Sequence, residues 1–184
     1  MSRLNELLQQ AGNIGRNEDG SITRLGFSEG YFQALELLKA RMKEIGMQVE
    51  TDPVGNLHGI LPGSDPEAKA IVIGSHLDTV IKGGVYDGML GVTGAKYSTP
   101  YDPRLIKLID DVCTEKGISH IIMPSGAGHD ANSMAHEGVP IGMIFVPSVK
   151  GISHQGDEYT KPEHIDMGAD VLYQTVLKLD ENGF

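Results

Sequence analysis

The stretch Ala70-Ile71-Val72-Ile73-Gly74-Ser75-His76-Leu77-Asp78 joins a short apolar run to a polar loop, and it decides the fold expected for this chain. The run 70–74 has no polar alternation, which is typical of a strand covered on both faces in a parallel sheet. Two more apolar runs occur at 118–123 and 141–146. Loops that follow such strands lie at the carboxyl edge of the sheet, where α/β proteins carry their sites.

Helices are predicted around these runs. The segment 29–45 has an apolar stripe at helical spacing, with Ser28 and Gly46 as start and stop signals. Further helices are predicted at 2–11, 103–116, 131–136 and 167–179. Apolar and polar residues then alternate with a period of two, which predicts a hairpin with strands at 47–52 and 56–61. Strands that alternate with helices predict an α/β layered domain with a largely parallel sheet.

The composition limits the class of protein. The chain has 184 residues, 40% of them hydrophobic, which is enough for one domain with a sizeable core. There are 25 acidic residues against 15 Lys and Arg. This balance argues against a nucleic-acid partner, because phosphate binding needs clustered basic residues. The apolar runs are too short to cross a membrane. A single cysteine, Cys113, is typical of a cytoplasmic protein.

Three loops carry residues that bind metals. His76 and Asp78 follow the run 70–74, Asp87 lies in a glycine-rich loop, and His154 follows the run 141–146. Imidazole nitrogens and carboxylate oxygens are usual ligands of Zn²⁺, and a carboxylate between two cations can bridge them. Taken alone, a His-x-Asp motif is more often a surface pair, by about three to one. An Asp-Gly is usually a turn. Their shared position after apolar runs favours a site.

A fourth loop, 124–131, follows the run 118–123 and is rich in small residues. Small residues that lead into a helix expose backbone N–H groups, which suit a carboxylate or another anion. His129 in this loop either hydrogen-bonds a substrate or caps a helix. For the loop as a whole, a binding site and a plain tight turn between strand and helix have equal weight.

These motifs resemble the amidase, hydantoinase and carbamoylase family, which is related to the zinc aminoacylases and exopeptidases. The resemblance is carried by Gly74-Ser75-His76-Leu77-Asp78-Thr79-Val80, by Asp87-Gly88-x-Leu90-Gly91-Val92, by Pro124-Ser125-Gly126-Ala127-Gly128-His129-Asp130-Ala131 and by Pro147-Ser148-Val149-x-Gly151-Ile152-Ser153-His154. Upstream, Thr23-Arg24-Leu25-x-Phe27-Ser28 also fits. The four main motifs occur in the family's order.

The resemblance implies a fold and a site. The implied fold is a three-layer α/β/α sandwich with a mixed, largely parallel sheet. The implied cofactors are two divalent metals, zinc or manganese, with His76 on one, His154 on the other and Asp87 bridging both. Asp78 would orient His76 through its other ring nitrogen. His129 would lie beside the substrate, a small ureide such as allantoate or an N-carbamoyl amino acid.

The sequence also departs from that family. The family's Glu-Glu pair, which supplies the general base and a metal ligand, does not occur here, and neither does the motif that carries a further His ligand. The break falls near 96–100. We therefore expect one catalytic-type domain over 1–184, made of an N-terminal part, 1–96, and a C-terminal part, 97–184, without the lid and dimerisation domain.

Three hypotheses follow. The first is an amidohydrolase that is weak or inactive in this form, because a general base contributes on the order of 10²–10⁴ in rate. The second is a non-catalytic remnant or minimal scaffold that binds a metal or a small carboxylate. The third is an aminoacylase or exopeptidase relative, since fold and metals do not fix the substrate. With the family's dimer interface lost, we also expect self-association through a newly exposed sheet edge.

Overall fold

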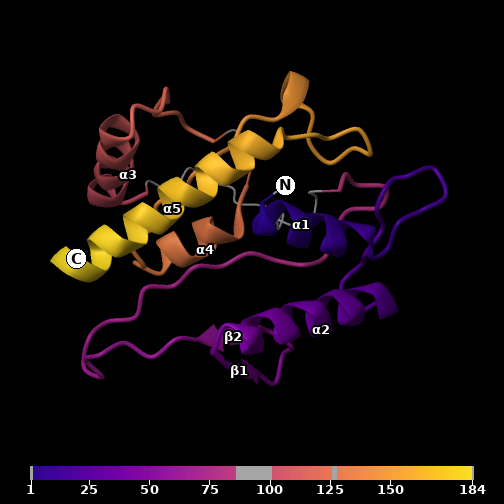
Figure 1. Ribbon diagram of the computed structural model, residues 1–184, viewed down its shortest axis with the longest axis horizontal. Helices are drawn as coiled ribbons and strands as arrows, with labels where there is room; N and C mark the ends of the chain where they lie inside the picture. Colours follow the sequence, from indigo (N-terminus) through magenta and orange to yellow (C-terminus); the bar gives the residue numbers. More distant parts are fainter. Residues whose placement is uncertain (1, 86–100, 126–127, 184) are drawn as a thin grey trace. The chain divides into compact units, whose positions relative to one another are not determined.

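The structure is a computed structural model that describes residues 2–85, 101–125 and 128–183, and Figure 1 shows its elements. The chain divides into two units. The hairpin unit is Glu6–Met89 with Ser153–Glu158, and the helical unit is Met1–Asn5, Leu90–Ile152 and Tyr159–Phe184. The first helix, α1 (Arg3–Asn13), begins in the helical unit and continues in the hairpin unit.

The hairpin unit confirms the predicted helix and hairpin. Helix α2 (Glu29–Glu44) begins after Ser28, whose hydroxyl accepts a hydrogen bond from the Tyr31 amide at 3.2 Å. Strand β1 (Gln48–Thr51) pairs antiparallel with β2 (Leu57–Ile60). The Asp52 carboxylate closes the turn between them, because it accepts from the amides of Val54 and Asn56. Such local bonds from an Asp to the following backbone are a common way to form a turn.

The helical unit contains α3 (Pro103–Glu115), α4 (Asp130–His136), a short 3₁₀ turn (Val149–Gly151) and α5 (Pro162–Asn182). Its core is formed by buried and half-buried apolar side chains of α3, α5 and two loops: Ile109, Val112, Cys113, Ile118, Ile144 and Val171. Helix α5 begins at Pro162, earlier than the predicted 167, because proline is favoured at the first helical position.

The N-terminus is tied to α5 within the helical unit. The side chain of Asn5 is buried, and its Nδ2 donates to Asp166 Oδ1 at 3.0 Å. The Ser2 hydroxyl donates to the same oxygen at 2.5 Å. One carboxylate oxygen on α5 therefore accepts hydrogen bonds from two side chains at the start of the chain.

The predicted parallel sheet is not found in the described residues, where the sheet is the β1–β2 hairpin. The runs 70–74, 118–123 and 141–146 have no strand pairing there. The prediction that the run 70–74 is buried is wrong, since the side chain of Val72 is 75% exposed. Ile121, at 78%, is also exposed. An apolar composition makes a run suitable for burial, whereas a strand also needs a neighbour in register to satisfy its N–H and C=O groups. The chain still combines helices and strands, as the predicted α/β class requires.

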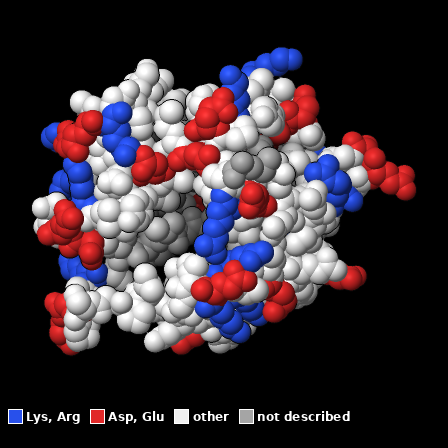
Figure 2. Space-filling view, in the orientation of Figure 1, with Lys and Arg blue, Asp and Glu red and all other residues white. Residues whose placement is uncertain are grey.

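The charged side chains are mixed on the surface. On the face drawn in Figure 2, Lys and Arg side chains are interspersed with Asp and Glu side chains. Several form ion pairs over short sequence distances, such as Lys39 with Glu36 and Arg41 with Glu44, both at 2.8 Å. In the part of the chain that the structure describes, no helix combines the length and the apolar character needed to span a membrane.

Candidate functional site

His76 and Asp78 form a hydrogen-bonded pair in the loop that follows the run 70–74. The His76 Nδ1 atom lies 3.0 Å from Asp78 Oδ1. The His76 side chain is 16% exposed, and its Nε2 atom is buried and has no hydrogen-bond partner among the residues that the structure describes. Because the carboxylate accepts from Nδ1–H, the lone pair of the neutral ring is placed on Nε2. A His whose second nitrogen is held by a carboxylate is a typical metal ligand.

The segment 21–24 holds this loop through backbone hydrogen bonds and through one bond to the Thr79 side chain. The amide of Arg24 donates to Thr79 Oγ1 at 2.8 Å, and the amide of Thr79 donates to the carbonyl of Arg24 at 2.9 Å. Ile22 and Gly83 exchange both amide–carbonyl bonds, at 2.9 and 2.8 Å. Ile22 is fully buried, so this attachment point lies in the core of the hairpin unit. The loop that carries His76 and Asp78 is therefore fixed at Thr79 and again at Gly83.

The His154 loop lies against the same segments. Residues Ser153–Glu158 belong to the hairpin unit, although in sequence they lie between two segments of the other unit, Leu90–Ile152 and Tyr159–Phe184. The backbone amide of His154 donates to Glu158 Oε2 at 2.8 Å. A Cβ at Gly84 would lie 2.7 Å from the Glu158 Cβ, so only glycine permits this approach. A Cβ at Gly156 would lie 3.2 Å from the Ser21 Cβ. The loops of His76 and His154 are thus both attached to the segment 21–24 and its partner at 83–84.

Asp87, the predicted bridging ligand, lies outside the described residues, as does the predicted break near 96–100. The described residues 2–85, 101–125 and 128–183 contain no group of three or more His, Cys, Asp or Glu side chains that could hold a metal ion. The roles of His76, His154 and Asp87 as metal ligands stay predictions.

His129 belongs to the helical unit. Its side chain is 7% exposed, and its Nε2 lies 2.6 Å from the Ser125 hydroxyl. The ring also packs on Phe145, with 5.6 Å between the ring centroids. Burial lowers the pKa of His129, which favours the neutral imidazole. His129 occupies the N-cap position of α4, but its side chain makes no capping hydrogen bond. The interpretation of this side chain as a helix cap is therefore wrong.

Sequence reasoning missed Glu158 and assigned no role to Thr79. Glu158 lies four residues after His154 in the same polar segment. A carboxylate so close in sequence to a candidate metal ligand was a signal that could have identified it. Thr79 had no such signal, because its partner Arg24 is 55 residues away in sequence.

Comparison with known proteins gives a family and several relatives. The profile of peptidase family M20/M25/M40 matches residues 48–178. The N-carbamoyl-L-amino acid amidohydrolase of Geobacillus stearothermophilus is 41% identical over 90 residues, which are 49% of this chain and 22% of that protein. The allantoate amidohydrolase of Bacillus subtilis is 37% identical over 92 residues, 50% of this chain and 22% of that protein. Allantoate deiminase 1 of Glycine max is 36% identical over 84 residues, 45% of this chain and 17% of that protein. Each match therefore spans about half of this chain and about a fifth of the relative.

Proposed function

The chain belongs to peptidase family M20/M25/M40, and from this premise we propose that it is a metal-dependent hydrolase of linear amide or ureide C–N bonds. The proposed substrates are allantoate or N-carbamoyl amino acids, the compounds that appear in the names of its relatives. The observation that carries the proposal is the His76–Asp78 pair. In this pair Nδ1 of His76 is held 3.0 Å from the carboxylate, and Nε2 is buried with no hydrogen-bond partner in the described part of the chain.

The residues of the hairpin unit fit a metal at His76. A buried imidazole nitrogen without a hydrogen bond is unfavourable unless something binds it, and a divalent cation satisfies it. The proposed ion is zinc or manganese, with His154 and Asp87 as further ligands and Asp87 as the bridge between two ions. When bound, such an ion polarises the scissile carbonyl and lowers the pKa of water.

The chain's own side chains have distinct proposed roles. Asp78 keeps the proton of His76 on Nδ1 and fixes the plane of the ring, which leaves Nε2 as the donor atom for the metal. His129, kept neutral by burial, is proposed to lie beside the substrate and to exchange a hydrogen bond with it. Its contact with the Ser125 hydroxyl at 2.6 Å supports this role by fixing the ring before a substrate arrives.

The fold proposed for the complete catalytic domain is a three-layer α/β/α sandwich with a mixed, largely parallel sheet. Its parts are 1–96 and 97–184, joined near 96–100. Family membership and the apolar character of the runs 70–74, 118–123 and 141–146 support it. Apolar side chains of these runs are exposed in the structure. Exposed apolar runs favour contact between copies of a chain, so we propose self-association through them.

A second candidate function is a non-catalytic domain that binds one metal or a small carboxylate. Two observations favour it. The sequence contains no Glu-Glu pair. The part of the chain that the structure describes holds no group of three candidate ligands. Without the general base, turnover would fall by about 10²–10⁴.

Metal content and ammonia release, measured on the same samples, separate the two functions. The purified chain is loaded with zinc or manganese, analysed for bound metal, and incubated with allantoate or an N-carbamoyl-L-amino acid. Two bound ions and ammonia release that disappears in His76→Ala support the hydrolase. One ion or none, without ammonia release, supports the second candidate. His136→Ala is the matched control, because this histidine is exposed in the last turn of α4.

A further inference from the structure

We propose that Arg24 is a positioning residue that holds the His76–Asp78 pair in the geometry needed for metal binding. This inference deepens the proposed function and rests on it. Arg24 belongs to the upstream motif 23–28, to which the resemblance assigns no role, and it lies outside the residues matched to the family profile, 48–178.

The guanidinium of Arg24 is buried among backbone carbonyls. Arg24 is 4% exposed. Its Nε donates to the Leu77 carbonyl at 2.7 Å, and its Nη1 donates to the carbonyls of Ala11 and Ile14 at 2.8 and 2.9 Å. A buried charge is strongly unfavourable unless hydrogen bonds compensate for the loss of water. These three bonds supply that compensation, and they tie two distant segments to one side chain.

The first of these segments is the C-terminal end of α1. Ala11 lies in the last turn of the helix, where carbonyls have no amide partner within the helix, and Ile14 follows the helix directly. The negative end of the helix dipole also lies here, so a cation is favoured at this position. Arg24 therefore has a rigid anchor on one side.

The second segment is the site loop itself. Leu77 lies between His76 and Asp78, and its carbonyl belongs to the peptide that leads into Asp78. The next peptide is also held by Arg24, because the amide of Thr79 donates to the Arg24 carbonyl at 2.9 Å. The backbone on both sides of Asp78 is thus bonded to Arg24. This attachment sets where the Asp78 carboxylate meets His76 Nδ1.

A lysine cannot replace this arginine. The guanidinium presents donors in a planar fork, which lets Nε and Nη1 reach carbonyls on different segments at once. A lysine ammonium donates from a single atom at the end of a flexible stem. Arg24→Lys therefore keeps the charge but releases either the anchor on α1 or the Leu77 carbonyl.

The test compares wild type, Arg24→Lys and the matched control Arg104→Lys. Arg104 is an exposed arginine of α3 that pairs with Asp102, the N-cap residue of that helix. Two quantities are measured: the ¹⁵N shifts of the His76 ring in the metal-free protein, which report its tautomer, and the affinity for Zn²⁺ by competition with a chromophoric chelator. We expect Arg24→Lys to populate both tautomers and to lose about 10- to 100-fold in zinc affinity. Arg104→Lys should match wild type. Wild-type tautomer and affinity in Arg24→Lys would overturn the proposal.

A double-mutant cycle separates positioning from general stability. If Arg24 acts through Asp78, then Arg24→Lys in an Asp78→Asn background should cause little further loss of zinc affinity. An additive loss would contradict the proposal. Thr79→Val removes the hydroxyl that accepts from the Arg24 amide and donates to the Val80 carbonyl, and it keeps the Arg24 side chain, so it provides a milder variant if Arg24→Lys does not fold. It should shift the tautomer in the same direction, and an unchanged tautomer would count against the proposal.

The two proposals fail in different ways. If wild type takes up neither zinc nor manganese, the proposed metal-dependent function is wrong. The tautomer of His76 in the metal-free protein still decides whether Arg24 positions this ring.

Discussion

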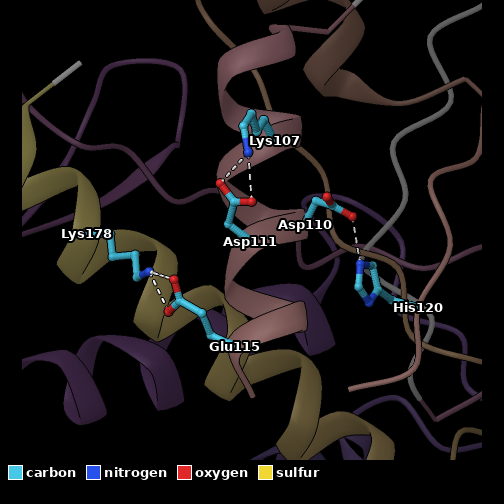
Figure 3. Close-up of polar contacts among 6 residues, drawn as sticks. All are labelled: Lys107, Asp110, Asp111, Glu115, His120 and Lys178. Carbon is cyan, nitrogen blue, oxygen red and sulfur yellow. Dashed lines mark hydrogen bonds and ion pairs between the residues drawn. The ribbon is translucent and has the colours of Figure 1, made fainter. Parts of the chain in front are cut away.

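His120 and Asp110 form an ion pair that joins the loop after α3 to α3 itself, with His120 Nε2 2.8 Å from Asp110 Oδ1 (Figure 3). The other ring nitrogen, Nδ1, lies 2.7 Å from the Ile118 carbonyl oxygen. Both ring nitrogens therefore face acceptors, and only the protonated ring donates to both. The charged groups nearby on α3 and α5 are already paired, Lys107 with Asp111 and Lys178 with Glu115.

This arrangement predicts a pH dependence. The pKa of His120 is raised above its ordinary value of 6.5, first by the Ile118 carbonyl and then by Asp110. A raised pKa in the folded state means that the stabilisation is complete below pH 6.5 and is lost as the pH rises through the raised value. Asp110→Asn should bring the pKa of His120, followed by NMR titration, back toward 6.5. Asp111→Asn is the control and should leave it raised, because Asp111 pairs with Lys107.

Gly84→Ala should detach the His154 loop. The added Cβ would lie 2.7 Å from the Glu158 Cβ and 2.9 Å from the Gln155 carbonyl oxygen, so the segment 153–158 must move. Hydrogen exchange at the His154 amide, which donates to Glu158, should become faster in this variant. Gly63→Ala should leave the exchange rate unchanged, because nothing lies within 4 Å of its added Cβ. Equal exchange rates in both variants would rule out the close approach at Gly84.

Ser28 should contribute to stability as the N-cap of α2. Ser28→Ala removes the hydroxyl that accepts from the Tyr31 amide, and the free energy of unfolding should fall by about 1 kcal/mol. Ser28→Gly should lower it by only a few tenths of a kcal/mol, since glycine is itself a good N-cap. Urea unfolding followed by circular dichroism measures both. A larger loss for glycine than for alanine would contradict this role for the hydroxyl.

Val72→Lys should weaken self-association. Val72 lies in the exposed run 70–74, and a lysine there blocks edge-to-edge pairing by charge repulsion. Sedimentation velocity over a range of concentrations should show a smaller share of oligomer than in wild type. Val54→Lys is the matched control, because Val54 is 71% exposed and lies outside the apolar runs. A wild-type chain that stays strictly monomeric at high concentration would contradict self-association.

The sequence predicted what depends on local pattern. Helix α2 and the β1–β2 hairpin were placed within a few residues of their observed bounds, since helical and strand periodicity, caps and turns are all encoded within each segment. The hydrogen bond between His76 and Asp78 is local in the same sense, because the two residues are only two positions apart in sequence.

What depends on distant partners could not be predicted. The run 70–74 has the composition of a buried strand, yet pairing requires a neighbour that composition does not specify. The bond from Arg24 to Leu77 spans 53 residues, and no pattern around Arg24 indicates it. The attachment of the His154 loop through Gly84 and Gly156 also depends on residues that are distant in sequence. It could not be predicted, because a glycine in a loop usually indicates only a turn.

The buried thiol in the core of the helical unit has a practical use. Cys113 is the only cysteine of the sequence, and its burial raises the pKa of the thiol, so it is slow to react while the unit is closed. An alkylating reagent can reach it only when α3 comes away from the residues packed around it. The rate of labelling therefore measures how often this unit opens. The native chain thus contains a built-in probe of local unfolding in the helical unit.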